Sequence, residues 1–160
     1  MIRKACPEDL DRILEVYACA RAFMVKAGNP NQWGDSHPPK ATLEDDIKKG
    51  NLYVILRDDV IRGVYAFIAG EDKTYGYIED GSWINDAPYC TIHRIASDGR
   101  EKGILAECVA YCRQICDNIR IDTHHDNKPM QNAIAKENFV KCGVIYVEDG
   151  SPRIAYQWVK

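Results

Sequence analysis

Long hydrophobic runs are missing from this sequence. No apolar stretch approaches the roughly 20 residues that a membrane-spanning helix needs. The opening residues, Met1-Ile2-Arg3-Lys4, are not followed by the apolar segment that marks a secretion signal. We therefore expect a cytoplasmic protein with no membrane partner.

Clusters of basic residues are also missing. The chain has 21 Lys and Arg against 24 Asp and Glu, which gives a formal net charge of −3. Sequence-independent binding of nucleic acid depends on concentrated positive charge, so we expect no nucleic-acid partner. Hydrophobic residues make up 46% of the 160 residues and charged residues 28%, a composition typical of globular proteins rather than disordered ones. This length and composition predict a single domain over residues 1–160.

Paired cysteine motifs are a third absence. The seven cysteines are scattered and form no C-x-x-C pair, so we expect reduced thiols. Cys108, Cys112 and Cys116 repeat every four residues, which favours buried core positions on a helix over a soft-metal site. His124 and His125 are adjacent, but neighbouring residues on a strand point to opposite faces, so we expect no metal.

What the sequence does contain is an alternation of strand and helix patterns. A loop over residues 28–41 includes Trp33, and loops of this length are usually functional or disordered. The alternation predicts an α/β (α+β) fold, a mixed sheet with helices on both faces. We expect strands over 2–5, 52–56, 60–69, 89–96, 119–123, 144–147 and 153–158, and helices from Pro7 to Gly28, from a Thr42 cap to Gly50, over 102–117 and over 128–139.

The segment with the clearest chemistry runs from the predicted strand at residue 92 to the start of the next helix. It reads Arg100-Glu101-Lys102-Gly103-Ile104-Leu105 at the helix start. Main-chain N–H groups there have no partner within the helix and lie at the positive end of its dipole, which suits a phosphate. A plain turn explains the same pattern equally well.

This segment resembles the signature of the GNAT superfamily of N-acetyltransferases, Arg/Gln-x-x-Gly-x-Gly/Ala, with Leu105 in place of the last Gly or Ala. The opening segment 2–9 and the whole element order also resemble the family. In its second motif, Asn127 and Phe139 match the family pattern. Ala, Tyr and Gly of that pattern are replaced by Met130, Ile134 and Asn138.

The resemblance implies a GNAT-like mixed, mostly antiparallel twisted sheet of about six to seven strands with a splayed central pair. It implies acetyl-CoA as co-substrate, with its pantetheine in the splay and its pyrophosphate on the helix start. The cofactor-binding residues that it implies are Ile95, Ala96, Ser97, Arg100, Glu101, Lys102, Gly103, Ile104, Leu105 and Asn127.

The activity that the resemblance implies is direct transfer of an acetyl group from acetyl-CoA to a primary amine of a small molecule or peptide, in a ternary complex. The Tyr that serves the family as general acid is Ile134 here. Another group then protonates CoA, or the thiolate leaves unassisted, or catalysis is weak or lost. The alternatives are a non-catalytic CoA-binding regulatory module and a structural domain that binds no CoA. Edge strands allow a homodimer.

Two residues are candidates for the general base that removes the proton of the amine. His93 lies two residues before Ile95, so on a regular strand both point to the same face, near the acetyl group. Glu79 is the second candidate, acting directly or through water. A structural histidine and an exposed acid are the corresponding alternatives.

Candidate substrate-binding residues come from three segments. Trp33, Tyr77 and Trp83 are candidates for the wall of a substrate pocket, although core packing is the commoner role of such aromatics. Asp122 and His124 share a face of the predicted strand 119–123 and are candidates for lining the cleft. Holding the splayed strands together is the alternative role for this pair.

Overall fold

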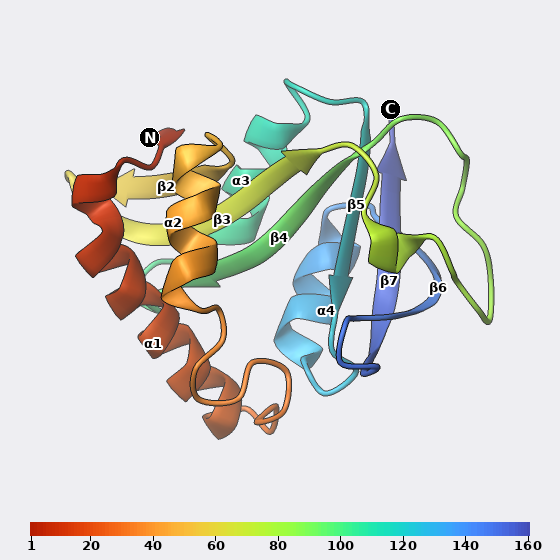
Figure 1. Cartoon of the computed structure of the whole chain (residues 1–160), viewed down its shortest axis with the longest axis horizontal. Coiled ribbons are helices and arrows are strands. Elements are labelled where there is room, and N and C mark those ends of the chain that lie inside the picture. Colours follow the sequence, from red (N-terminus) through yellow and green to blue (C-terminus); the bar gives the residue numbers. More distant parts are fainter.

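A computed structural model describes all residues from Met1 to Lys160. Seven strands form one sheet in the order β1-β2-β3-β4-β5-β7-β6. Neighbouring strands are antiparallel except β4 and β5, which are parallel (Figure 1). The predicted mixed, mostly antiparallel sheet is confirmed. The elements are β1 (Ile2–Lys4), α1 (Leu10–Lys26), α2 (Lys40–Lys48), β2 (Leu52–Arg57), β3 (Val60–Ala69), β4 (Cys90–Ser97), α3 (Ile104–Cys112), β5 (Asn118–Thr123), α4 (Lys128–Lys136), β6 (Val140–Tyr146) and β7 (Pro152–Val159), with single 3-10 turns at Pro7–Asp9 and Lys73–Tyr75.

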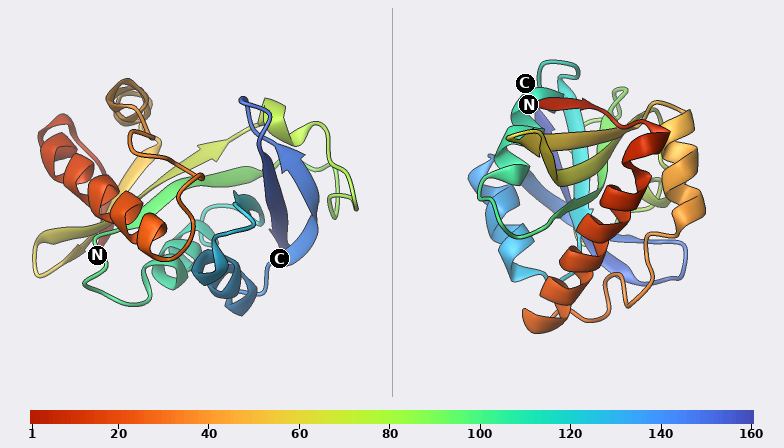
Figure 2. Two further views of the ribbon diagram at one scale, coloured as in Figure 1. Left: turned by 90° about the horizontal axis from the view of Figure 1, so that it is seen from below. Right: turned by 90° about the vertical axis from the view of Figure 1, so that its left-hand side faces the viewer.

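Helices cover both faces of the sheet, as predicted (Figure 2). One cluster of buried apolar side chains joins α1 and α2 to β2 and β3, and a second joins α3 and α4 to the centre of the sheet. Cys108 and Cys112 belong to the second cluster, which confirms that they are core residues. Over β5 and β7, a long segment between β3 and β4 covers the face that α1 and α2 leave open. None of the helices combines the length and the apolar character needed to cross a membrane.

Several predicted boundaries were wrong. Helix α3 ends at Cys112, because the amides of Gln114 and Ile115 bond to carbonyls three residues back instead of four, and Ile115 is 55% exposed. Thr42 does not cap α2, since the helix begins directly after the extended Pro39. Strand β6 begins at Val140 rather than at residue 144.

The parallel pair at the centre of the sheet is splayed. Strands β4 and β5 are in register only at Cys90 with Ile119 and at Thr91 with Arg120. Beyond these positions the two strands separate, and the main chain of β4 from residue 92 onward has no strand partner on the β5 side. The predicted splay is therefore confirmed, and it opens a gap in the middle of the sheet.

A bulge in β4 changes which side chains reach that gap. Ala66 of β3 pairs with His93 and Val64 with Ala96, so β4 carries one more residue than β3 over this interval. The bulge includes Arg94, which has a positive φ of 51°. Ile95 packs in the cluster beneath α3 and α4, whereas His93 turns to the opposite face. The expectation that His93 and Ile95 share a face was wrong, because the bulge breaks the strand's alternation.

Candidate active site

A cleft of about 820 Å³ lies where β4 and β5 separate. Its walls come from both splayed strands, from the loop between α1 and α2, from the 72–74 turn and from the turn between β6 and β7. Residues far apart in the sequence therefore converge on one site. Five predicted site residues line it together: Trp33, His93, Ile95, Asp122 and Asn127.

His93 forms a hydrogen bond with Asp72 inside this cleft. The Nε2 atom of His93 lies 2.8 Å from Oδ2 of Asp72, and both side chains are about 20% exposed. Burial on its own raises the pKa of Asp72, but hydrogen bonds from His93 and Thr74 outweigh it and lower the pKa to about 2. An ionised carboxylate only accepts hydrogen bonds, so the neutral imidazole carries its proton on Nε2. Its Nδ1 lone pair is then available to take a proton from a ligand.

A second carboxylic acid, Asp122, lies beside the His93–Asp72 pair. Tyr75 Oη donates a 2.6 Å hydrogen bond to Oδ2 of Asp122, and the Tyr75 ring centre is 6.1 Å from that of His93. Burial raises the pKa of Asp122 and of Tyr75. The backbone of Tyr75 is fixed in turn, because its carbonyl accepts a 2.9 Å hydrogen bond from Nε1 of Trp83.

The loop between α1 and α2 is attached to the cleft through Gln32. Its Oε1 accepts hydrogen bonds from Nδ2 of Asn127 at 2.9 Å and from Nδ2 of Asn29 at 2.8 Å. Asn127 also caps α4, since its Oδ1 accepts the amide N–H of Met130 at 3.2 Å. Trp33 packs edge-on against Tyr17 at 5.6 Å. The long loop is thus ordered and forms one side of the cleft.

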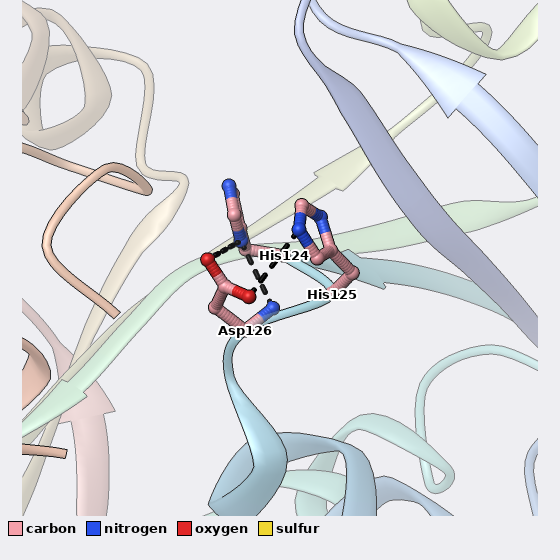
Figure 3. A group of neighbouring side chains, drawn as sticks. All are labelled: His124, His125 and Asp126. Atoms are coloured by element: carbon pink, nitrogen blue, oxygen red, sulfur yellow. Dashed lines mark hydrogen bonds and ion pairs between the residues drawn. The ribbon is translucent and has the colours of Figure 1, made fainter. Parts of the chain in front are cut away.

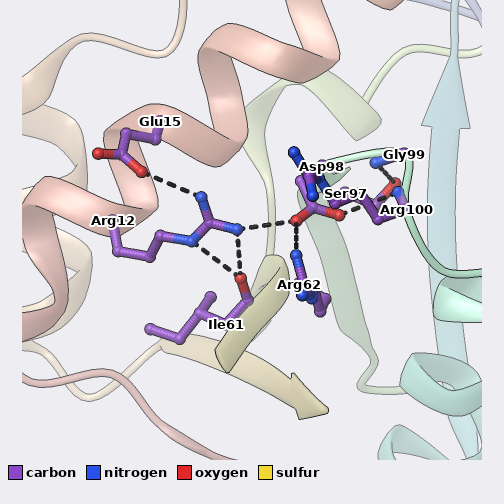
Figure 4. Close-up of polar contacts among 8 residues, drawn as sticks. All are labelled: Arg12, Glu15, Ile61, Arg62, Ser97, Asp98, Gly99 and Arg100. Atoms are coloured by element: carbon purple, nitrogen blue, oxygen red, sulfur yellow. Dashed lines mark hydrogen bonds and ion pairs between the residues drawn. The ribbon is translucent and has the colours of Figure 1, made fainter. Parts of the chain in front are cut away.

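Asp98 anchors the loop that leads into α3 (Figure 4). Its Oδ2 accepts hydrogen bonds from Arg12 at 2.8 Å and from Arg62 at 2.9 Å, and its side chain is almost completely buried. Its Oδ1 accepts the amide N–H of Arg100 at 3.1 Å. Burial raises the pKa of Asp98, but these partners outweigh it and the net pKa is lowered. The start of the signature segment is therefore held by a fixed ionic cluster.

Gly103 begins α3 with a φ of 78° and provides no side-chain cap, so the first amides of the helix are left for a ligand. A Cβ on Gly103 would have no atom within 4 Å. Leu105, where the family has Gly or Ala, points into the core cluster rather than into the loop. Ile104 packs so closely over Gly63 that a Cβ there would lie 2.9 Å from its Cγ2.

The splay also contains polar groups without a protein partner. The hydroxyl of Thr123 is buried, lines the cleft and forms no hydrogen bond. The main chain of β4 opposite to it is unpaired on the β5 side. Together with the uncapped start of α3, these groups suit an extended ligand with amides at one end and phosphates at the other, which is the chemistry of a pantetheine and a pyrophosphate.

Other predicted residues lie elsewhere. Glu79 is placed beside β6, where its carboxylate accepts hydrogen bonds from Tyr146 and, at 2.9 Å, from Tyr77. Trp83 packs under the guanidinium of Arg120, 4.0 Å from the ring centre. None of Glu79, Tyr77 and Trp83 lines the cleft.

Ala96 is buried beneath α1, and Ser97 accepts the amide N–H of Gly99 at 3.3 Å.

His124 lies just past the end of β5, and its ring stacks on that of His125 with centroids 4.4 Å apart (Figure 3). The expectation that these two side chains point to opposite faces was wrong, because the strand has already ended at Thr123. With Asp126 they form a group whose ligand atoms lie within 4.8 Å of one another, which is a possible metal-binding arrangement. His124 Nδ1 already accepts the amide N–H of Asp126 at 3.0 Å.

Sequence reasoning missed four residues that shape the site. Asp72 and Tyr75 sit in an acidic, aromatic segment whose spacing gave no sign of which members face the cleft. Asp98 lies just before the signature segment, and nothing in the sequence indicates that Arg12 and Arg62 would bind it. Arg153, which lines the cleft from β7, lies in an ordinary strand pattern and gave no signal at all.

The comparisons with known proteins point in one direction. No model of a known protein family matches the chain, and neither does any curated protein. Among solved structures, an acetyltransferase of the GNAT family from Streptococcus agalactiae 2603 is 31% identical to this chain. The match covers 100% of this chain and 95% of that one, with a TM-score of 0.92.

Two more distant structures share the fold. A GNAT-family acetyltransferase from Listeria monocytogenes 4b F2365 is 18% identical, with a TM-score of 0.71 over 100% of this chain and 94% of that one. A ribosomal-protein-alanine N-acetyltransferase from Brucella melitensis is 14% identical, with a TM-score of 0.66 over 100% of this chain and 99% of that one.

Proposed function

The chain belongs to the GNAT family of acetyltransferases, and from that premise we propose that it moves an acetyl group from acetyl-CoA to a primary amine of a small molecule or peptide. Transfer is direct, within a ternary complex. The observation that carries this proposal is the His93–Asp72 pair in the cleft between the splayed strands.

In the proposed reaction His93 is the general base. An ammonium ion has no lone pair, so the acceptor must lose a proton before its nitrogen forms a bond to the thioester carbon. The Nδ1 atom of His93 takes that proton, while Asp72 holds the ring and stabilises the imidazolium. The C–S bond then breaks, and the imidazolium gives its proton to the departing thiolate. The neutral imidazole that this regenerates accepts the second proton, which the nitrogen loses as it becomes an amide. Ile134, at the family's tyrosine position, is fully buried and takes no part.

Acetyl-CoA, when bound, supplies the acetyl group as a thioester. The groups that fit its phosphates are the amides from Glu101 to Leu105, which follow the Arg100 amide that Asp98 holds. The unpaired main chain of β4 near Ile95 fits the pantetheine and provides an N–H donor for the developing oxyanion. The hydroxyl of Thr123 adds a partner on the opposite strand.

The test is an amine panel with release of CoA thiol as the readout. Wild-type protein should acetylate at least one amine, and His93→Ala should lose about 100-fold or more in kcat, the usual contribution of a general base. His125→Ala is the matched control, because this histidine is exposed and lies outside the cleft.

Turnover that is unchanged in His93→Ala would contradict the assignment of the base. Glu79, the second candidate, would then be tested by Glu79→Gln. Binding of acetyl-CoA without turnover of any amine would favour the alternative of a non-catalytic CoA-binding module.

A further inference from the structure

Arg153 is a buried cation that the protein leaves without a counter-ion. It is only 7% exposed, yet its side chain lines the cleft and forms no ion pair. Its guanidinium donates two hydrogen bonds, both to main-chain carbonyls: Nη1 to Pro152 at 2.9 Å and Nη2 to Gln32 at 3.3 Å. A guanidinium has five N–H donors, so three are left without an acceptor in the protein.

Arg94, the other arginine that lines the cleft, does have a counter-ion. Arg94 is paired with Asp46 at 2.6 Å, as expected for a guanidinium taken out of water. Asp122 and Asp149 lie close enough to Arg153 to raise its pKa, but burial outweighs them and the net pKa is lowered. A positive charge kept buried in a cleft without a paired anion indicates a site for a ligand anion.

The position of Arg153 assigns it to the acceptor side of the sheet. Ile154, Tyr156 and Trp158 of β7 pack against the core beneath α3 and α4. Ala155 lies on the opposite face, in a cluster with Tyr75. Arg153 alternates with Ile154 and reaches the same face as Ala155, where it contacts the loop between α1 and α2.

His93 lies on that face as well, next to Tyr75. The candidate phosphate site at the start of α3 lies on the other face. Arg153 therefore lies on the side of the base rather than on the side of the CoA phosphates.

We infer that the acceptor is a primary amine that also carries an anionic group, a carboxylate or a phosphate, and that Arg153 binds this group while the amine faces His93. The inference rests on the proposed function and adds the chemical class of its acceptor. Arg is well suited to this role, because its planar fork binds either oxyanion through two parallel hydrogen bonds.

The experiment uses matched amines that differ only in the second group. Glycine, β-alanine and 4-aminobutyrate supply the carboxylates, their carboxamides the neutral counterparts, and aminomethylphosphonate and 2-aminoethylphosphonate the phosphonates. For wild-type protein we expect kcat/KM to be at least about tenfold higher for an anionic member than for its amide, the effect of about 1.4 kcal/mol from one charged hydrogen bond. The ranking of carboxylate and phosphonate identifies the source of the anion.

Arg153→Gln should raise the KM for the anionic acceptor and leave the KM for acetyl-CoA unchanged. Arg153→Lys keeps the charge and should recover part of the loss, which separates lost binding from a folding defect. Arg21→Gln is the control, because Arg21 also donates to a carbonyl of this loop, that of His37, but does not line the cleft.

Equal rates for acids and amides in wild-type protein would overturn the inference while leaving the proposed function intact. A KM for the anionic acceptor that is unchanged in Arg153→Gln would overturn it too. If no amine of any kind were acetylated, the proposed function itself would fail, and the inference with it.

Discussion

Asp72→Asn is the substitution that probes the site most specifically. It keeps the size and shape of the side chain but removes the charge that fixes His93. An amide can donate as well as accept, so the imidazole loses the constraint that puts its proton on Nε2. A proton on Nδ1 would block the lone pair that the proposed mechanism needs.

The expected magnitudes follow from the structure. His93 would lose most of its action as a base, so kcat should fall by about 100-fold, the lower end of what general-base catalysis contributes. The pKa of Asp72 is lowered from its usual value of 3.8 to about 2, which corresponds to about 2.5 kcal/mol of preference for the ionised form. The free energy of unfolding at pH 7 should therefore fall by about 2 kcal/mol.

The contribution of the Asp72 carboxylate to the free energy of unfolding changes with pH in a definite direction. Because the pKa of Asp72 is lower in the folded state, its contribution is present above about pH 4 and is lost as the pH falls towards 2. The wild-type and Asp72→Asn proteins should differ in urea unfolding at pH 7 and converge near pH 2.

Initial rates of thiol release give kcat for the same two proteins. Glu71→Gln is the control, since it removes a charge from the adjacent exposed residue, which forms no ion pair. An Asp72→Asn protein with wild-type kcat would refute the role given to the His93–Asp72 pair.

Further predictions concern the groups around this pair. Tyr75→Phe leaves the half-buried carboxyl of Asp122 without its 2.6 Å hydrogen bond, and urea unfolding should show a loss of about 1–3 kcal/mol. Leu105→Ala should cost about 2–5 kcal/mol of stability, because the side chain is a core residue. The same variant should bind acetyl-CoA with an unchanged Kd in a calorimetric titration. Asp98→Asn should raise that Kd, because the carboxylate positions the amide of Arg100.

The sequence predicted the architecture well because local residue patterns specify the strands and helices. The alternation of strand and helix signals defined the sheet and its two layers of helices, and the glycine at residue 103 marked the start of α3. The resemblance at Arg100–Leu105 and Asn127 added the family, which the 31% identical structure supports along the whole chain.

The parts of the site that escaped prediction depend on events that no local pattern records. The bulge at Arg94 turns His93 away from the face of Ile95, and strand alternation alone predicts the opposite. The partner of His93 is Asp72, 21 residues earlier, which reaches it only because β3 and β4 are neighbours in the sheet. Arg153 enters the cleft from the last strand, and only the folded chain brings it there.

We propose that acetyl-CoA binds in the splay between β4 and β5, with its phosphates at the start of α3. The most direct test is a calorimetric titration of the wild-type, Gly103→Glu and Gly28→Glu proteins with acetyl-CoA. Both glycines have a positive φ and open space around a Cβ, so the two variants carry similar backbone strain. We predict micromolar binding to wild-type and Gly28→Glu proteins and none to a folded Gly103→Glu protein. Undiminished binding to Gly103→Glu, or no binding to the wild type at millimolar acetyl-CoA, would contradict this placement of the cofactor.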